Sequence, residues 1–303
     1  EVFGISRQAY YKRIHKSYDE EQKQAQVINL VKPLRREQSR LGTLKVYKMI
    51  KPSLDKMQIK LGRDRFYTVM RDHAMLIRRK KNFIKTTNSN HRFRKHPNLI
   101  KGNVYNKAEQ VWVSDITYIK TEQGYLYLSL ITDLYSKKIM GYNLSDNMKV
   151  ESSAIALRMA IANRQYPERA LIHHSDRGFQ YCSDNYTKLL EDNNIKISMT
   201  QSYDPYENAV AERVNGILKG EFDIAEGFVS EAQAQREIKN VINIYNNKRP
   251  HISCDYVTPV LAHIQQKHKP KFYSRLLTNK HILTKEKRSK KEKATQNSIN
   301  FKS

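Results

Sequence analysis

Cysteine is nearly absent from this sequence, which has only Cys182 and Cys254 among its 303 residues. Two isolated cysteines are too few for a disulfide framework or a thiolate metal site, so we expect reduced thiols in a cytoplasmic protein. The sequence also lacks a run of 18 apolar residues and a secretory signal. We therefore expect no membrane-spanning segment and no export.

Acidic residues are outnumbered, with 30 against 55 basic residues and a net charge of +25. The excess is uneven, because residues 1–101 carry a net +18, residues 102–266 a net −3 and residues 267–303 a net +10. A charge that served solubility alone would be spread over the whole surface. This distribution suits a near-neutral core with phosphate-binding arms, so we expect nucleic acid as the partner.

Residues 1–77 indicate a small all-helical, DNA-binding region. Ser6 is a predicted N-cap for a basic, aromatic helix that contains Arg7, Lys12 and Arg13. That segment fits the recognition helix of a helix-turn-helix whose first helix is missing, or else the frayed end of an amphipathic helix. Further helices are predicted over residues 20–35, 43–50 and 64–77.

Two segments have too little apolar periodicity to pack into a core. Residues 78–101 form a basic linker that either follows DNA or is only a solvated tether. Residues 267–303 form a basic tail that we expect to be disordered. The residues of the linker predicted to contact DNA are Arg78, Arg79, Lys80, Lys81, Arg92, Arg94 and Lys95.

Residues 102–266 predict an α/β domain. Three consecutive strands followed by alternating helices and strands indicate a mixed sheet flanked by helices, which is the order of a ribonuclease-H-like fold. The predicted strands cover residues 111–119, 124–132, 138–144, 170–174 and 195–199. The predicted helices cover residues 151–163, 184–193, 208–220 and 231–247.

Three acidic residues of this domain stand in unusual surroundings. Asp115 lies inside the apolar run VWVSDITYI, Asp176 directly follows a short apolar strand, and Glu212 lies on a predicted helix. Carboxylates at strand ends and on a helix can converge, and such hard oxygen ligands bind Mg²⁺ or Mn²⁺ rather than zinc. Two such ions roughly 4 Å apart activate one oxygen and stabilise another during attack on phosphorus.

Other carboxylates of the domain lie in loops or near helix ends, where capping or solvation explains them. By contrast, burying Asp115 in a strand without a cation or a proton would cost several kcal/mol. The two histidines before Asp176 are expected to pack in the core or to support its loop. The rival carboxylates are Asp133, Asp146, Asp184, Asp204, Glu207 and Glu221.

The spacing around these residues resembles one known family. Asp176 and Glu212 are separated by 35 residues, and Lys219 follows Glu212 by seven. Short strings accompany them in order: W-x-x-D-I-T-Y from Trp112, H-S-D-R-G from His174 and Y-N-N-K-R-P-H from Tyr245. Together they resemble the Asp-Asp-Glu transposases with a retroviral-integrase-like core, and most of all the insertion-sequence transposases encoded by two overlapping frames.

The resemblance implies a catalytic triad and a reaction. Asp115, Asp176 and Glu212 would hold two Mg²⁺ or Mn²⁺ ions, cleave DNA at a 3′ end and transfer that end to another phosphodiester. Asn208 and Lys219 would contact DNA, although Asn208 could instead cap its helix and Lys219 could be solvated. A catalytically inactive DNA-binding regulator and a ribonuclease-H-like nuclease remain as alternatives.

The resemblance also implies partners. Double-stranded DNA would supply terminal inverted repeats and a target, and a homo-oligomer would hold two ends in the nucleoid of a bacterial cytoplasm. Because the first residue is Glu1 rather than Met, we expect the chain to begin partway through a longer product. An upstream frame with a helix-turn-helix and a leucine zipper would be a partner or fusion. No membrane partner is expected.

Overall fold

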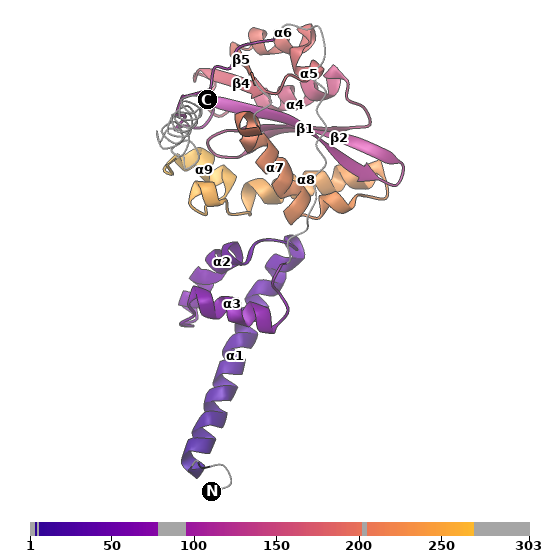
Figure 1. The fold of residues 1–303 in the computed structure, drawn as a ribbon. Helices are drawn as coiled ribbons and strands as arrows, with labels where there is room; N and C mark the ends of the chain where they lie inside the picture. Colours follow the sequence, from indigo (N-terminus) through magenta and orange to yellow (C-terminus); the bar gives the residue numbers. More distant parts are fainter. Residues whose placement is uncertain (1–3, 5, 78–94, 202–204, 270–303) are drawn as a thin grey trace, which may run out of the picture.

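The computed structural model describes residue 4 and residues 6–77, 95–201 and 205–269. It shows a helical unit at the N-terminal end and an α/β core above it (Figure 1). The basic tail and most of the basic linker lie outside the described residues, as do six of the predicted DNA contacts: Arg78, Arg79, Lys80, Lys81, Arg92 and Arg94.

The helical unit contains α1 (Arg7–Glu37), α2 (Thr43–Lys56) and α3 (Arg63–Asp72). Ser6 caps α1, since its hydroxyl accepts a hydrogen bond from the Ala9 amide at 3.3 Å. The prediction of two separate helices within α1 was wrong. The stretch between them contains neither Gly nor Pro to end a helix, so one helix continues through it with its side chains exposed.

A five-stranded sheet forms the centre of the α/β core. Its strands run in the order β3-β2-β1-β4-β5; β1, β2 and β3 are antiparallel neighbours, while β4 and β5 run parallel to β1. This confirms the predicted mixed, ribonuclease-H-like sheet. The strands are β1 (Val111–Thr121), β2 (Gly124–Asp133), β3 (Ile139–Ser145), β4 (Leu171–Ser175) and β5 (Ile195–Met199).

Helices cover both faces of the sheet (Figure 1). One apolar cluster joins the fully buried Trp112 to α4 and α6, and another joins Leu128 to α7 and α8. On the first face α4 approaches β3 so closely that a Cβ added to Gly141 would meet the Ala156 carbonyl oxygen at 2.1 Å. The helices are α4 (Val150–Ala162), α5 (Phe179–Cys182), α6 (Asp184–Asp192), α7 (Ala209–Glu221), α8 (Glu231–Asn247) and α9 (Pro259–Gln265).

The core begins before and ends after the strands and helices that the sequence predicts. Ile100 is 5% exposed and packs against Val111, and the Pro97 carbonyl accepts a hydrogen bond from the Met199 amide at 3.2 Å. At the other end, the His268 ring stacks on Tyr135 at 4.0 Å. Within the described helices, none has the length and apolar character that a membrane crossing requires.

Charged side chains join the helical unit to the core. Glu221, at the end of α7, accepts hydrogen bonds from Lys45 of α2 at 2.6 Å and from Arg249 at 2.8 and 2.9 Å. The Arg40 guanidinium also donates to the Gly220 carbonyl at 3.1 Å and lies 3.6 Å from Asp223. The predicted solvated or capping role of Glu221 was therefore wrong, because two cations from separate elements meet at it.

Candidate active site

Asp115 and Asp176 lie beside each other on neighbouring parallel strands. The register pairs Ser114 of β1 with Ser175 of β4, and each aspartate is the next residue along its strand. Asp115 is thus within β1, whereas Asp176 stands just beyond the end of β4. Both side chains are half-buried rather than fully enclosed. The sheet alone therefore brings two of the three predicted carboxylates together.

The loop after β4 fixes the orientation of Asp176. Its Oδ1 atom accepts a hydrogen bond from the Gly178 amide at 3.0 Å, which closes a turn of the Asx type. A Cβ on residue 178 would lie 3.0 Å from that oxygen and 2.9 Å from Oε1 of Gln180. The glycine of the H-S-D-R-G string is therefore explained by the close approach of a carboxylate.

Helix α7 lies against β1 and carries Glu212 on its first turn. Two hydrogen bonds hold it there: Asn208 Nδ2 donates to the Ser114 carbonyl at 3.0 Å, and Asn215 Nδ2 donates to Asp115 Oδ2 at 2.7 Å. At about 100° per residue, Asn208, Glu212 and Asn215 occupy one face of the helix. Glu212, which is exposed, lies between the two anchors.

The electrostatics of the site reflect this convergence. Burial, followed by the neighbouring charges of Asp176 and Glu212, raises the pKa of Asp115 to about 7, against the opposing effect of hydrogen bonds from Asn215 and the Ile116 amide. Burial lowers the pKa of Lys219, and the Asp115 carboxylate opposes that shift. The charges of the three carboxylates and of Lys219 are thus felt at one place, and a bound cation would relieve the repulsion.

The residues fit a hard divalent cation by donor type, because all three carboxylates offer oxygen. Among the residues that the structure describes, no three His, Cys, Asp or Glu side chains are grouped closely enough to form a ready metal site. Two buried amide oxygens nearby, Asn208 Oδ1 and Asn215 Oδ1, have no hydrogen-bond partner in the described part of the chain. The carboxylates are neighbours that an ion would have to draw closer.

Histidines next to Asp176 serve as internal supports. His173 is 1% exposed and lies 2.6 Å from the Ser114 hydroxyl and 3.0 Å from the Tyr186 hydroxyl. His174 joins the Ser198 hydroxyl at 2.8 Å to the Glu207 carbonyl at 3.1 Å. Burial lowers the pKa of His173 to about 3 and that of His174 to about 4, so both are neutral. His173 thus has the predicted core role, whereas His174 supports β5 and the loop before α7 rather than the Asp176 loop.

Asp133 has the structural role that the sequence suggested as its alternative. Its Oδ1 atom accepts hydrogen bonds from both the amide and the hydroxyl of Ser136 at 2.7 Å, and Oδ2 accepts from the Glu109 amide at 2.7 Å. His263 of α9 joins this group, 3.1 Å from Glu109. The carboxyl group at the end of β2 therefore fixes a turn and a terminal helix and takes no part in the triad.

Asn215 is the site residue that sequence reasoning missed. It reads as an ordinary polar residue on a helix, and only its offset of three from Glu212 could have drawn attention to it. The structure also gives Asn208 a packing role, since its side chain is 7% exposed and its amide binds β1.

Of the predicted DNA contacts that the structure describes, four are exposed: Arg7, Lys12, Arg13 and Lys95. Lys219 is half-buried on the face of α7 that carries Glu212. The exposed residues lie on α1 and just before the core, away from α7 in the sequence. Of these, Lys95 lies close enough to the site that its charge and that of Asp176 both act on the pKa of the Cys182 thiol.

Comparison with known proteins gives consistent matches. Residues 105–205 and residues 193–259 each match a family described as "Integrase core domain". The "Insertion element IS600 uncharacterized 31 kDa protein" of Shigella sonnei is 35% identical over 263 residues, which cover 86% of this chain and 95% of the relative. The "Transposase InsF for insertion sequence IS3A" of Escherichia coli (strain K12) is 35% identical over 164 residues, 54% of this chain and 57% of that protein.

Solved structures of retroviral integrase cores are similar as well. The HTLV-2 integrase catalytic core domain in complex with magnesium is 17% identical with a TM-score of 0.42, and the match covers 52% of this chain and 97% of that chain. The catalytic core domain of BIV integrase is 16% identical with a TM-score of 0.40, and its match covers 52% of this chain and 96% of that chain.

Proposed function

This chain belongs to the insertion-sequence transposases with an integrase-like core, and we propose that it cleaves DNA at the 3′ ends of an insertion sequence and transfers those ends to a target. The proposal rests above all on the hydrogen bond from Asn215 to Asp115. Through it, the helix that carries Glu212 is held against the strand that carries Asp115.

In this proposal Asp115, Asp176 and Glu212 hold Mg²⁺ or Mn²⁺, two ions in each site. Such ions activate the attacking oxygen and stabilise the leaving one when bound. Asn215 orients Asp115, and the Gly178 amide orients Asp176. Lys219, on the Glu212 face, binds a phosphate of the DNA end. His173 and His174, both neutral, keep the strands and the loop before α7 in place and carry no proton in the reaction.

The basic segments outside the core supply the DNA affinity in this proposal. Lys12, Arg13 and Lys95 bind phosphates of the inverted repeats or the target, and the linker arginines and lysines extend that contact. The protein acts in the bacterial cytoplasm as a homo-oligomer that holds two ends. The product of an upstream frame, with a helix-turn-helix and a leucine zipper, joins it as a partner or a fusion.

Carboxylate variants test the chemistry apart from DNA binding. Asp115→Asn and Glu212→Gln should each abolish strand cleavage and transfer with Mg²⁺ or Mn²⁺, because a charged ligand is lost at almost no change in volume. DNA affinity should remain. Glu151→Gln is the matched control, since Glu151 also lies in the first turn of a helix, α4, and is exposed. Full cleavage by purified Asp115→Asn protein would refute the triad.

The salt dependence of binding tests the role of the basic segments. Affinity of the full chain for inverted-repeat DNA should fall steeply between about 50 and 200 mM salt, in proportion to the phosphates neutralised. A fragment of residues 95–269 keeps the core and its packed ends, so it should retain its fold and bind far more weakly. Equal affinity of fragment and full chain would place the contacts on the core instead. Cleavage of an RNA–DNA hybrid, with none of duplex DNA, would favour the nuclease alternative.

A further inference from the structure

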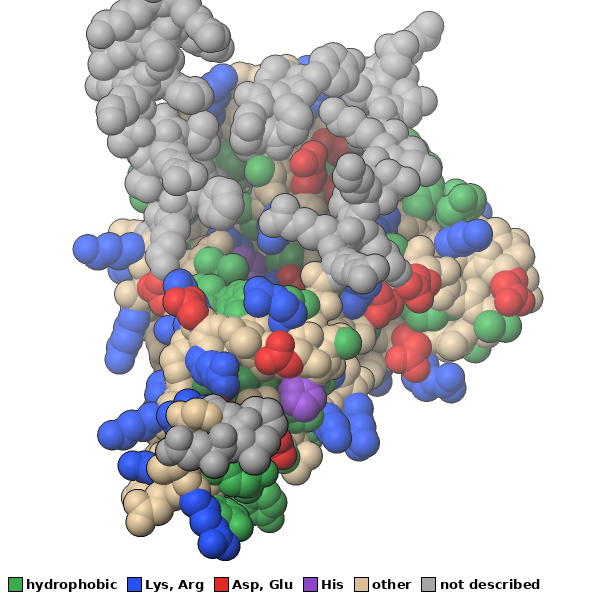
Figure 2. All heavy atoms as spheres, turned by 60° about the horizontal axis from the view of Figure 1, so that its bottom comes forward, with side chains coloured by type: hydrophobic (Ala, Val, Ile, Leu, Met, Phe, Trp, Pro, Cys, Tyr) green, Lys and Arg blue, Asp and Glu red, His purple; other side chains and the backbone are tan. Residues whose placement is uncertain are grey.

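The first half of α1 projects from the helical unit (Figure 1), and its apolar side chains are exposed to solvent. Tyr10, Tyr11, Ile14 and Tyr18 are 49%, 48%, 45% and 60% exposed, and the buried residues of α1 begin only at Val27. Figure 2 shows hydrophobic side chains gathered at this projecting end, with Lys and Arg side chains around them. So much aromatic surface on one free helix is characteristic of a contact with another molecule.

These apolar residues share a face whose two ends carry opposite charges. At about 100° per residue, Tyr10 and Tyr18 lie within roughly 40° of Ile14, and Arg7 and Glu21 lie within roughly 20° of it. The face therefore begins with a cation, continues with apolar side chains and ends with an anion. The opposite side of the same turns carries Lys12, Lys16 and Lys23.

The pattern is symmetric about Ile14. Tyr10 and Tyr18 stand four residues to either side of it, and Arg7 and Glu21 stand seven residues to either side. We propose that this face of α1 pairs with the same face of a second copy of the chain, in antiparallel orientation with Ile14 on the two-fold axis. Arg7 of each copy then meets Glu21 of the other, Tyr10 meets Tyr18, and Ile14 meets itself.

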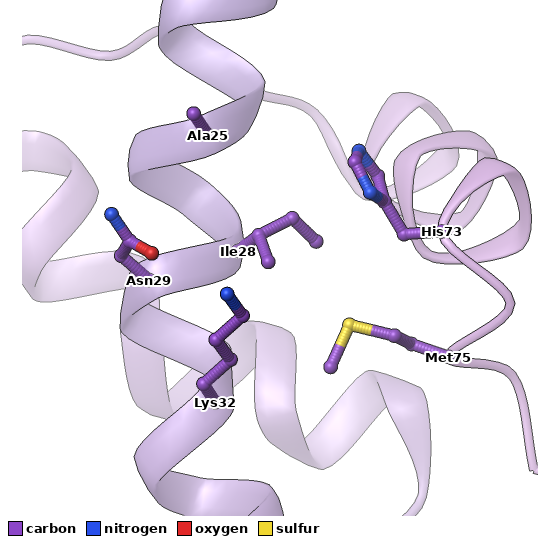
Figure 3. A pocket seen from close by; sticks show the side chains of 6 residues that line it. All are labelled: Ala25, Ile28, Asn29, Lys32, His73 and Met75. Carbon is purple, nitrogen blue, oxygen red and sulfur yellow. The ribbon is translucent and has the colours of Figure 1, made fainter.

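Other arrangements of two copies lack this complementarity. A parallel pair sets Arg7 against Arg7 and Glu21 against Glu21. A groove of about 460 Å³ lies further along the same face, between Ile28 and Lys32 of α1 and the loop that holds His73 and Met75 (Figure 3). If the two-fold axis of an antiparallel pair lay midway between Arg7 and Lys32, closer to that groove, Arg7 of one copy would face Lys32 of the other. Like charges oppose each of these alternatives, and the centre at Ile14 avoids them.

The pair would leave the opposite side of each helix free. Lys12, Lys16 and Lys23 would face outward from the dimer, where they can bind DNA, while Arg7 moves from the DNA contacts to the pair. The idea that such a dimer holds two DNA ends rests on the proposed function. The pairing of α1 does not depend on that function, because association of the two copies can be measured without DNA or catalysis.

Engineered cysteines in the full chain test the geometry. Cys182 and Cys254, the only native cysteines, are buried, so an introduced surface thiol reacts selectively. Ile14→Cys should form a disulfide-linked dimer under mild oxidation. The Tyr10→Cys protein and the Tyr18→Cys protein, each oxidised by itself, should run as monomers on a non-reducing gel. A mixture of the two proteins should form a disulfide-linked dimer. Lys16→Cys, on the outward side, is the matched control and should not crosslink.

Charge reversal tests the ion pairs. Sedimentation of the untreated protein should show a monomer–dimer equilibrium, and Arg7→Glu should weaken it about tenfold, roughly 1.4 kcal/mol. Adding Glu21→Arg in the same chain should restore it, because the pairs are then merely exchanged. Ile14→Glu should weaken the dimer at least as much, while circular dichroism shows the same helix content.

Three results would overturn the proposal. Self-crosslinking of Tyr10→Cys and of Tyr18→Cys would show a parallel pair. If the protein with both Arg7→Glu and Glu21→Arg did not regain association, the proposed ion pairs between Arg7 and Glu21 would be excluded. Unchanged association of the Ile14→Glu protein, with weaker DNA binding, would assign the face to DNA.

Discussion

Asn215 and Asp115 are 100 residues apart in the sequence, yet the amide of the first donates to the carboxylate of the second at 2.7 Å. The contact joins α7 to the middle of β1 and lies one helical turn from Glu212. Because burial and two neighbouring carboxylates all disfavour the charged form of Asp115, this hydrogen bond is one of few interactions that stabilise it. An amide on α7 therefore helps to keep a carboxylate on β1 ionised.

Removing that amide should impair catalysis more than folding. We expect Asn215→Ala to lower the rate of strand cleavage about 10- to 100-fold, the usual effect of losing a group that orients a metal ligand. More Mg²⁺ or Mn²⁺ should recover part of the rate, because the defect is in holding the ion. Asn247→Ala, an exposed change on α8, is the control. An Asn215→Ala protein with a normal metal titration would show that Asp115 needs no such support.

Gly141 should tolerate no side chain. A methyl group there would meet the Ala156 carbonyl oxygen at 2.1 Å and the Ala160 amide at 2.6 Å, so α4 would have to move away from β3. We expect Gly141→Ala to lower the free energy of unfolding by roughly 3 kcal/mol. Gly216→Ala, where the added carbon has no neighbour within 4 Å, should instead gain about 1 kcal/mol. Urea unfolding of both proteins measures the difference, and equal stabilities would contradict the close packing.

The group around His263 should make stability depend on pH. Burial lowers the pKa of His263, but the Asp133 carboxylate 3.8 Å away and the hydrogen bond with Glu109 at 3.1 Å outweigh it and raise the value above 6.5. Burial likewise raises the pKa of each carboxyl group. Interaction with His263 and hydrogen bonds from backbone amides outweigh burial, so the pKa lies below 3.8 for Asp133 and below 4.5 for Glu109. The histidine contribution is therefore complete below pH 6.5 and is lost as the pH rises, whereas the carboxylate contributions are lost as the pH falls below 4.5.

Stability from this group should thus be greatest between pH 4.5 and 6.5. The melting temperature of the native protein should fall from pH 6 to pH 9 through this contribution. His263→Gln should be less stable by roughly 3 kcal/mol at pH 6, since a buried partner is removed, and should show a flatter dependence above that pH. His15→Gln, exposed on α1, is the control. An unchanged pH profile in His263→Gln would show that the histidine is neutral in the folded protein.

Glu221 should matter for the attachment of the helical unit and not for chemistry. Arg249 is 1% exposed and Lys45 is 5% exposed, so loss of the carboxylate leaves two buried cations without compensation. We expect Glu221→Gln to cost roughly 3 to 5 kcal/mol of stability, whereas Glu212→Gln should cost little. Protease cleavage between the two units should become faster. A Lys45→Met change combined with Glu221→Gln should cost less than the sum of the two.

Much of the fold could be predicted because it follows from local patterns. Short apolar runs bounded by turns predicted all five strands, with ends that differ from the observed ones by a few residues. The rest depends on what each segment packs against. α1 was predicted as two helices, although its exposed middle contains no Gly or Pro that would end a helix. The helical pattern predicted from residue 64 extends to residue 77, but α3 ends at Asp72 and His73 is exposed.

The sequence by itself determined which three carboxylates are the candidates and in what order they occur, because a carboxylate inside an apolar strand and the spacing between motifs can both be seen in the sequence. Only the tertiary structure decided which distant side chains meet. Asn215 with Asp115, Lys45 with Glu221 and Glu109 with His263 are pairs separated by 100, 176 and 154 residues. Their energy arises from burial and mutual charge once the chain has folded. The residues adjacent to each partner in the sequence do not indicate that it will be buried or which charge it will meet.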